Sequence, residues 1–289
     1  MTDALTLFEQ ERPRLKRLAY RMLGSVSEAE DAVQDAWLRW DRAGGEADNP
    51  KAWLVQAVTR LCLDRLKSAR ARRETYVGPW LPEPLIEEPG VDPVERAEDV
   101  SVAFLLALER LSPLERAVFL LHDVFDQDYA AIAATLGKTE PAVRQLASRA
   151  RSHVQDARPR FVVPQDRAVR LAAAFLNAAA ANDLSGLSAL LAEDAVLISD
   201  GGGKRPAALR PMIGRDDVML LLNGLWKRKG FPVPGGIRPA TINGAAGVVM
   251  TLDDGFQTMA FEPDATGDRI AAIYIIRNPE KLGHLLPSP

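Results

Sequence analysis

Residues 129–151 read YAAIAATLGKTEPAVRQLASRAR, and this stretch predicts two short helices joined by a tight turn. Gly137 stands where the first helix should end, because glycine tolerates the positive φ of a helix C-terminus. Thr139 can cap the second helix, and Pro141 falls in its first turn, where a missing N–H costs little. Apolar residues recur at helical spacing in both halves, at Ile132, Ala133 and Leu136 and then at Val143, Leu146 and Ala147.

Polar side chains line the other face of the second helix, which gives the layout of a helix-turn-helix that places its second helix in the DNA major groove. An ordinary helical hairpin with a solvated basic face is the alternative. Arg144 and Arg149 are the best candidates for contacts to guanine edges or phosphates. Glu140 could accept from cytosine N4 or could favour the helix dipole. The full candidate set is Thr139, Glu140, Arg144, Gln145, Ser148 and Arg149.

Length and composition indicate a globular protein of two or three domains, with 289 residues, 47% hydrophobic and 26% charged. The single cysteine, Cys62, excludes an internal disulfide framework and a cysteine-cluster zinc site. Its apolar helical surroundings favour a buried structural thiol. We expect no metal site and no cofactor. The N-terminus shows no signal pattern and the chain no long apolar span, so we expect a cytoplasmic protein.

Charge is distributed unevenly along the chain. A basic run lies between Arg65 and Arg73, and further basic residues lie between Lys138 and Arg160. Between them, residues 75–100 are acidic and contain prolines at a density that forbids a continuous helix. This pattern suggests two DNA-contacting modules joined by a linker. The aromatic in Trp80-Leu-Pro-Glu-Pro84 indicates that the linker docks onto another surface, although a stray aromatic is the alternative.

Residues 4–73 read as helices. We predict a capping box at Ser27-Glu-Ala-Glu30 and a helix that carries Trp37 and Trp40 on its apolar side. Pro50 opens the next helix, and Ser112-Pro-Leu-Glu115 forms a second capping box further along.

The chain after Pro164 changes character and predicts an α+β domain. A long helix is expected from Arg167 to Ala181. Asp200-Gly-Gly-Gly-Lys204 favours a turn that touches a neighbouring domain, although Asp200 could in principle present a general base. The spacing of a phosphate loop is missing. Strands of an antiparallel meander are expected at Ala240–Asn243, Gly247–Leu252, Gln257–Phe261 and Arg269–Arg277, with a turn at Asp253-Asp-Gly255.

Nearly the whole chain resembles the extracytoplasmic-function (ECF) sigma factors of bacterial RNA polymerase. The part after the second DNA-contacting module resembles the SnoaL-like extension of one subgroup, with that subgroup's linker motif at Trp80–Pro84. The sigma-like segments are Glu30–Leu38 and Ala52–Leu54 with Thr59–Arg65 in region 2, and Leu111–Arg151 in region 4; the extension motifs are Asp200–Lys204 and Asn278-Pro-Glu-Lys-Leu282.

The resemblance implies a multidomain fold, with two all-α sigma domains and a C-terminal α+β SnoaL-like cone. The expected parts are region 2 at 1–74, the linker at 75–100, the region 4 helix-turn-helix at 101–160 and the SnoaL-like domain at 165–285. The implied function is to direct core RNA polymerase to promoter DNA, with the fused domain in place of a separate anti-sigma protein. The cone could also take a small-molecule ligand.

The resemblance also assigns roles to residues. The residues 139–149 named above would read the −35 element, and the Asp41–Lys51 loop would hold an unstacked −10 base. Polymerase binding falls to Asp31, Gln34, Asp35 and Leu38. The −10 region would be contacted by Arg60, Asp64, Lys67, Arg70 and Arg73. The regulatory contact would involve Trp80, Leu81, Pro82, Asp200, Gly201, Gly202, Gly203, Lys204, Asn278 and Pro279.

Two other classes of function stay open at this point. One is a one-component regulator that joins a helix-turn-helix to a ligand-sensing cone, which binding to core polymerase would exclude. The other is a SnoaL-type enzyme fused to a DNA reader, which a ligand above an acid in the cone would favour.

Overall fold

The computed structural model describes residues 2–44, 47–87, 101–154, 163–229 and 236–285. The chain divides into two compact units. One unit is helical and comprises Met1–Thr75 with Ala103–Arg158. The other is built on a sheet and comprises Tyr76–Val102 with Pro159–Pro289. The predicted combination of helical domains with a C-terminal α+β domain is therefore confirmed.

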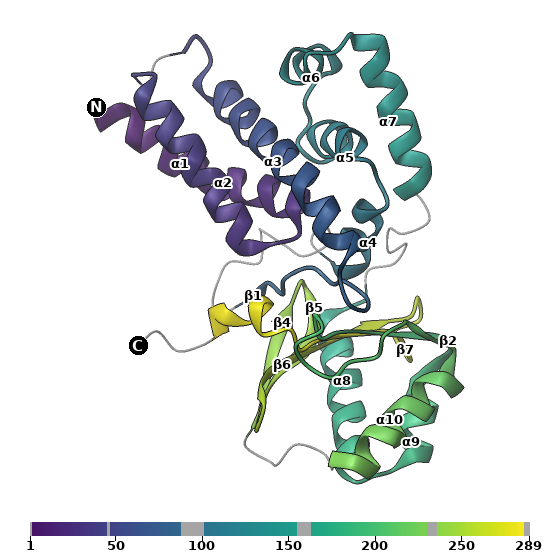
Figure 1. The fold of residues 1–289 in the computed structure, drawn as a ribbon. Helices are drawn as coiled ribbons and strands as arrows, with labels where there is room; N and C mark the ends of the chain where they lie inside the picture. Colours follow the sequence, from purple (N-terminus) through teal and green to yellow (C-terminus); the bar gives the residue numbers. More distant parts are fainter. Residues whose placement is uncertain (1, 45–46, 88–100, 155–162, 230–235, 286–289) are drawn as a thin grey trace. The chain divides into compact units, whose positions relative to one another are not determined.

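Three long helices form the first part of the helical unit (Figure 1). They are α1 (Thr2–Leu23), α2 (Val26–Arg42) and α3 (Pro50–Glu74), and each packs against the other two. Leu15, Trp40 and Leu54 are fully buried among them. Trp37 is half-buried with its ring against Phe8, so the predicted apolar side of α2 is confirmed for Trp40 and partly for Trp37.

The capping box predicted at Ser27 is wrong. The N-cap of α2 is Ser25, whose hydroxyl accepts a hydrogen bond from the Glu28 amide at 3.1 Å. Gly24 ends α1 with a φ of 68°, and this places Ser25 in the extended conformation that an N-cap requires. Ser27 therefore lies inside the first turn of the helix.

Shorter helices complete this unit. Ser112 and Glu115 form the predicted capping box, and Gly137 ends α6 in the left-handed region with a φ of 61°. The end of α5 widens into a π-helical turn, η3. The elements are α4 (Val102–Glu109), α5 (Pro113–Phe119), η3 (Leu120–Val124), α6 (Tyr129–Leu136) and α7 (Glu140–Val154).

The second unit contains a seven-stranded sheet in the order β1-β4-β5-β6-β7-β2-β3. Strands β4 to β7 form the predicted antiparallel meander, with a two-residue loop between Leu252 and Gly255. The strands are β1 (Ile86–Glu87), β2 (Leu191–Asp200), β3 (Met212–Ile213), β4 (Ile237–Ile242), β5 (Ala245–Leu252), β6 (Gly255–Pro263) and β7 (Ile270–Ile276). The helices are α8 (Gln165–Ala180), α9 (Leu184–Leu190) and α10 (Arg215–Lys229), followed by the short turns η4 (Pro279–Lys281) and η5 (Gly283–Leu285).

Three features of this unit differ from the sequence-based expectation. β2 lies parallel to β7, β1 comes from the linker and pairs with β4, and α10 was not predicted. Pairings between distant segments are not encoded in the local pattern of apolar residues.

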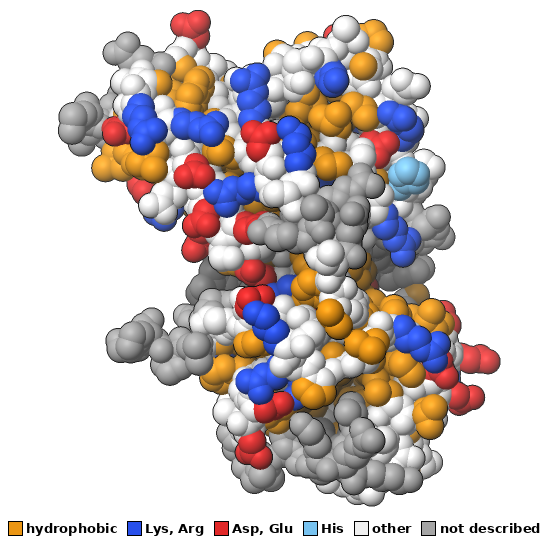
Figure 2. Space-filling model, in the orientation of Figure 1, with side chains coloured by type: hydrophobic (Ala, Val, Ile, Leu, Met, Phe, Trp, Pro, Cys, Tyr) orange, Lys and Arg blue, Asp and Glu red, His pale blue; other side chains and the backbone are white. Residues whose placement is uncertain are grey.

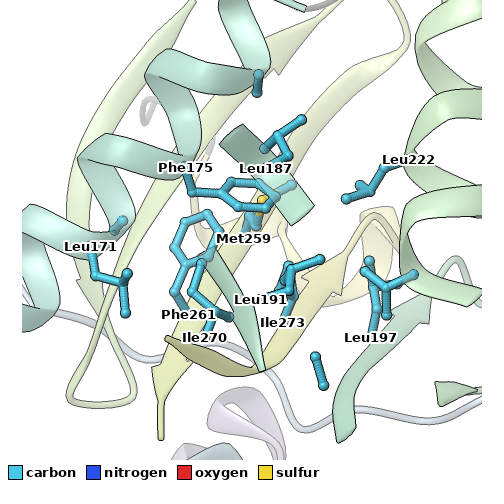
Figure 3. Packing of buried hydrophobic residues seen from close by; sticks show 14 of the residues in the cluster. Leu171, Phe175, Leu187, Leu191, Leu197, Leu222, Met259, Phe261, Ile270 and Ile273 are labelled. Atoms are coloured by element: carbon cyan, nitrogen blue, oxygen red, sulfur yellow. The ribbon is translucent and has the colours of Figure 1, made fainter. Parts of the chain in front are cut away.

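One face of the sheet packs against α8, α9 and α10 through an apolar core (Figure 3). Phe175 of α8 and Phe261 of β6 lie in it with ring centroids 5.1 Å apart. Leu187, Leu191 and Ile273 are also fully buried there. Alternate residues of β5 to β7 point into this core, so their neighbours face the opposite side of the sheet.

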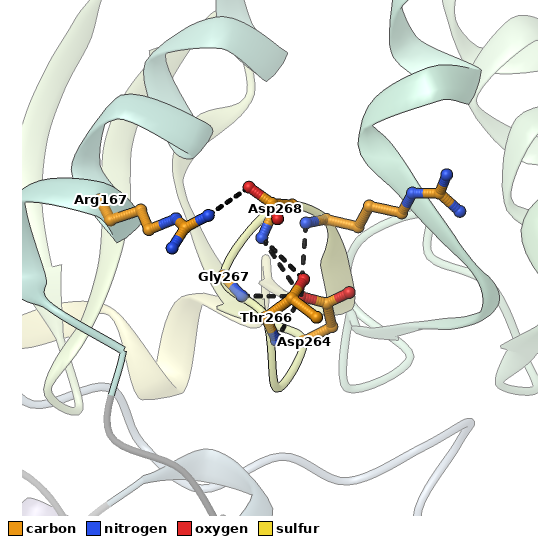
Figure 4. Close-up of polar contacts among 6 residues, drawn as sticks. Arg167, Asp264, Thr266, Gly267 and Asp268 are labelled. Carbon is orange, nitrogen blue, oxygen red and sulfur yellow. Dashed lines mark hydrogen bonds and ion pairs between the residues drawn. The ribbon is translucent and has the colours of Figure 1, made fainter.

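The turn between β6 and β7 is fixed by one carboxylate (Figure 4). Asp264 Oδ1 accepts hydrogen bonds from the Thr266 hydroxyl at 2.8 Å and from the Gly267 amide at 2.9 Å. Arg167 of α8 forms an ion pair with Asp268, which ties the turn to the helix layer. Among the described helices, none is long and apolar enough to cross a membrane.

Candidate functional site

The linker is held against the second unit through the backbone of Leu81. Asp200 Oδ2 accepts a hydrogen bond from the Leu81 amide at 2.8 Å, and Lys281 Nζ donates to the Leu81 carbonyl. Asp200 and Lys281 also form an ion pair at 2.7 Å, and their side chains are 0% and 7% exposed. The backbone amide and the backbone carbonyl of the buried residue Leu81 are thus both hydrogen-bonded to this one buried ion pair.

Tyr76 forms a second contact with the same carboxylate. Its hydroxyl donates to Asp200 Oδ1 at 2.6 Å and accepts from Asn278 Nδ2 at 2.8 Å. Burial, and after it the hydrogen bond to Asp200, raises the pKa of the Tyr76 phenol, which therefore stays protonated and able to donate. The Gly202 amide donates to Asp200 Oδ1 as well, at 3.0 Å.

The ammonium group of Lys281 also contacts two aromatic rings of the linker. Its Nζ lies 4.3 Å from the Trp80 ring centroid and 5.1 Å from that of Tyr76. A desolvated cation over aromatic faces contributes about 2 kcal/mol, more than the same contact in water. The predicted docking of Trp80 is explained by this cation, because the ring covers a lysine that would otherwise be buried beside a single counter-ion.

The glycines after Asp200 are required by close approaches. A Cβ on Gly202 would lie 2.3 Å from Asn278 Nδ2, and Gly202 has a φ of 59°. A Cβ on Gly201 would lie 2.1 Å from the Arg205 carbonyl oxygen. The turn can therefore bring Asn278 and Tyr76 onto Asp200 only if these positions carry no side chain.

A further set of hydrogen bonds holds Leu85 of the linker. The side-chain Oδ1 of Asn243 accepts a hydrogen bond from the Leu85 backbone amide at 3.1 Å. The backbone amide of Asn243 donates to the Leu85 carbonyl at 2.8 Å. The next residues form β1, in which Ile86 is paired with Ile242 of β4. Residues 76–87, about half of the predicted linker, therefore belong to the second unit.

The structure brings together most of the predicted regulatory residues. Leu81 and Pro82 are buried, and Asn278 caps the turn η4 that begins at Pro279. Lys204 does not contact the linker in the described hydrogen bonds and ion pairs; it pairs with Glu280 within its own unit.

Three residues of this site were missed from the sequence: Tyr76, Asn243 and Lys281. Lys281 could have been found, because it belongs to the Asn278–Leu282 motif. No local signal marks the other two.

The predicted polymerase-binding residues lie on the outer side of α2. Asp31, Gln34 and Leu38 are exposed, opposite the buried residues Ala32 and Ala36.

Asp35 is partly engaged within the unit. Its carboxylate forms an ion pair with Arg65 of α3 at 2.8 Å, and Arg65 also donates to the Glu28 carbonyl at 3.2 Å. Part of the basic run is thus bound to α2.

The predicted −10 residues lie along α3. Arg60, Asp64 and Lys67 are exposed, and the last two form an ion pair at 2.9 Å. The side chains of Arg70 and Arg73 lie outside the described residues. On the face drawn in Figure 2, Lys and Arg side chains of the helical unit are interspersed with acidic ones.

Helix α6 of the predicted region 4 packs against α3 of the predicted region 2. Arg60 Nε donates to the Thr135 carbonyl at 3.1 Å, and Gln56 Nε2 donates to the Ala134 carbonyl at 3.4 Å. Carbonyls near the C-terminus of a helix carry partial negative charge and favour such a cation. One predicted DNA-contacting arginine is therefore engaged with the other DNA-reading module.

A pocket of about 580 Å³ opens beside this contact. Asn49 and Lys51, from the loop expected to hold an unstacked base, line one side of it. Asp128 and Ala131 of the helix-turn-helix line another. The pocket is thus formed jointly by the two modules.

Arg116 of α5 provides a buried contact between the same modules. Its Nη1 donates to the Met22 carbonyl at 2.6 Å and to Glu109 Oε1 at 2.7 Å. Burial lowers the pKa of Arg116 to about 10, so it remains charged at neutral pH. No local sequence signal distinguishes this arginine from a surface one.

The polar face of α7 is exposed, as the helix-turn-helix prediction requires. Gln145 and Ser148 lie on it and are exposed, as is Thr139 directly before the helix. Arg144 pairs with Glu140 at 2.5 Å, and Arg149 approaches Glu115 at 3.4 Å. Both arginine side chains remain more than half exposed, so they can still reach a ligand.

Comparison with known proteins matches both halves of the helical unit. Residues 7–72 match Sigma-70 region 2, and residues 101–154 match Sigma-70, region 4. The chain is 41% identical over 286 residues to the ECF RNA polymerase sigma factor SigJ of Mycobacterium tuberculosis, covering 95% of this chain and 91% of the relative. It is 39% identical over 186 residues to the probable ECF RNA polymerase sigma factor SigI of that organism, covering 62% and 64%.

The fold is also similar to a solved structure. The crystal structure of the extracytoplasmic function sigma factor SigJ of Mycobacterium tuberculosis superposes with a TM-score of 0.79 at 36% sequence identity. The match covers 96% of this chain and 98% of that one, so it includes both units.

Proposed function

Because this chain belongs to the extracytoplasmic-function sigma factors of bacterial RNA polymerase, in the subgroup with a fused SnoaL-like domain, we propose that the fused domain regulates it by holding the linker. A sigma factor directs core polymerase to specific promoters, and this activity follows from the family. The one-component regulator is not favoured. The site of action that we propose is the cytoplasm, with core polymerase.

The capture of Leu81 by Asp200 and Lys281 is the observation that carries the proposal. A linker bound in this way cannot change its path freely, and the two DNA-reading modules are joined through it. A tethered domain acts at high effective concentration, so weak contacts are sufficient for strong regulation. In this account, no separate anti-sigma protein is required.

The packing of α6 on α3 supports a resting state that cannot engage a whole promoter. The −35 and −10 elements are about 25 base pairs apart, or roughly 85 Å along B-DNA. Gln56 and Arg60 of the −10 helix are hydrogen-bonded directly to the −35 module. The modules must separate for both to bind, and release of the linker would permit this.

Individual roles follow from exposure and charge. We assign promoter contacts at −35 to Arg144 and Arg149, phosphate contacts at −10 to Arg60 and Lys67, and polymerase contacts to the exposed side of α2 around Gln34. We propose the domain limits expected from the sequence, with residues 76–87 of the linker docked within the second unit.

We further propose that the C-terminal domain is not an enzyme. Asp200, the one carboxylate considered as a general base, is 0% exposed and accepts hydrogen bonds from Tyr76, Leu81 and Gly202 in addition to the Lys281 pair. A base must be free to accept a substrate proton, and these donors occupy both oxygens. Bulky side chains such as Phe175 and Phe261 occupy the interior of the cone.

Truncation after about residue 160 tests the regulatory role. Run-off transcription with core polymerase on a genomic library first identifies a cognate promoter. We expect the truncated and full chains to differ in transcription from it. Equal activity would sink the regulatory proposal, while leaving the assignment as a sigma factor intact.

A further inference from the structure

Three side chains from separate elements meet beside the proposed −35 helix. His122 lies in the π-helical turn η3, Tyr129 opens α6, and Arg144 projects from α7. The ring centroids of His122 and Tyr129 are 4.1 Å apart, with 30° between the ring planes. The guanidinium carbon of Arg144 lies 4.7 Å from the Tyr129 centroid.

The guanidinium group of Arg144 is held from a second direction by Glu140. Nε and Nη2 donate to Glu140 Oε1 at 3.2 and 2.5 Å. A guanidinium carries five N–H donors, and this contact uses two of them. The Arg144 side chain is 61% exposed, so the remaining donors can reach a base edge or a phosphate.

Tyr129 is itself fixed by the elements around it. His122 Nδ1 lies 2.7 Å from the Gln127 carbonyl, which can only accept, so Nδ1 carries the proton. Arg151 donates to Asp123 at 2.7 Å, and hydrogen bonds to Asp123 and then to Tyr129 raise the pKa of Arg151. A π-helical turn inserts an extra residue and often occurs at functional sites.

We propose that Tyr129 is a positioning residue for promoter recognition, in which its ring, supported by His122, holds the Arg144 guanidinium ready for DNA. The inference rests on the proposed role of Arg144 at the −35 element. A planar guanidinium that is already ordered loses less conformational freedom when it binds. From the usual strength of a partly exposed cation–π contact, the expected contribution to promoter affinity is about fivefold.

A double-mutant cycle in the full chain, reconstituted with core polymerase, tests this on the cognate promoter fragment. Arg144→Ala should weaken binding about tenfold or more. Tyr129→Leu should weaken it about fivefold, and Tyr129→Phe, which keeps the ring, should stay within about twofold of the unchanged protein. The variant with both Tyr129→Leu and Arg144→Ala should bind no more weakly than Arg144→Ala alone.

Additive losses, or full affinity with Tyr129→Leu, would overturn the positioning role while leaving that of Arg144 in place. No effect of Arg144→Ala would overturn both. If Tyr129→Leu does not fold, the same cycle with Tyr129→Met decides, because methionine keeps an apolar side chain at this position and removes the aromatic face. Tyr129→Met should lose about fivefold, and unchanged affinity would contradict the proposal.

Discussion

Asp200 and Lys281 form a buried ion pair at 2.7 Å, and both side chains also hydrogen-bond to the backbone of Leu81 in the linker. The pair joins a motif at the end of β2 to a motif near the C-terminus. Its carboxylate and its ammonium group satisfy the amide and the carbonyl of one linker residue. Docking of the linker therefore depends on the integrity of the pair.

Replacing Lys281 by Met should release the linker. The change leaves Asp200 buried without its counter-ion, which typically costs about 3–5 kcal/mol, and it removes the donor to the Leu81 carbonyl. Amide hydrogen exchange of residues 76–87 should rise strongly. Lys204→Met is the matched control, because its exposed pair with Glu280 contributes less than about 1 kcal/mol. Equal exchange in the two variants would count against this dependence.

Gly202→Ala should have a similar effect through geometry. Its Cβ would collide with Asn278, which hydrogen-bonds to Tyr76, and the positive φ adds strain of about 1 kcal/mol. Limited proteolysis should then cleave the linker faster. Gly224→Ala in α10 is the control, since its Cβ would meet nothing within 4 Å. Unchanged cleavage in Gly202→Ala would show that the close approach is not needed.

A cross-link between α3 and α6 should lock the resting arrangement. Gln56→Cys with Ala134→Cys places two thiols on either side of a contact that a glutamine side chain now spans, so a bifunctional maleimide with a cleavable disulfide spacer can join them. The native Cys62 will not interfere, because burial raises its pKa to about 12. The cross-linked protein should fail to support transcription, and cleavage of the spacer by a reductant should restore it. Full activity of the cross-linked form would exclude the need for separation; Gln56→Cys alone controls for the substitution.

Glu115→Gln should reduce stability in a pH-dependent way. The hydrogen bond from the Ser112 hydroxyl lowers the pKa of the Glu115 carboxyl below its ordinary 4.5. Because the pKa of this carboxyl is lower in the folded than in the unfolded protein, the carboxylate stabilises the folded protein at pH values above 4.5. This contribution is lost as the pH falls through the folded-state pKa. Thermal melting should therefore show a deficit of about 1 kcal/mol at pH 7 that disappears in acid. A deficit that persists in acid would point to packing instead.

Arg144→Ala with Arg149→Ala should impair promoter recognition without loss of polymerase binding. The two side chains lie on the exposed face of α7, whereas the predicted polymerase-binding residues lie on α2. Loss of two cations should lower the slope of log affinity against log salt by about 2. Asp31→Asn with Gln34→Ala should instead weaken core polymerase binding without impairing promoter recognition by α7. Loss of polymerase binding in the arginine variant would contradict the separation of roles.

Local signals were sufficient for much of this fold. The sequence alone located the end of α6 at Gly137 and the start of α5 at the capping box of Ser112 and Glu115, because these signals involve only residues within three or four positions of one another. The helix end predicted at Ser27 was wrong, because the N-cap is Ser25. Gly24 selects Ser25 over Ser27 through its backbone conformation.

The linker site was predicted only in part, because its contacts join distant residues. Trp80 stood out as an aromatic among prolines, and Asp200 through the glycines after it. Tyr76 and Asn243 carry no such mark, because each is an ordinary polar residue until folding places it beside its partner, 124 and 158 residues away. The parallel pairing of β2 with β7 escapes prediction for the same reason.

In our proposal, the docked linker carries the regulatory effect of the C-terminal domain. Run-off transcription from the cognate promoter by the full chain with Asp200→Asn is the decisive experiment, because this change weakens the ion pair without removing the domain. We expect transcription to change about threefold or more, roughly 0.7 kcal/mol, in the same direction as after truncation at residue 160. Unchanged transcription, or a change in the opposite direction, would contradict it.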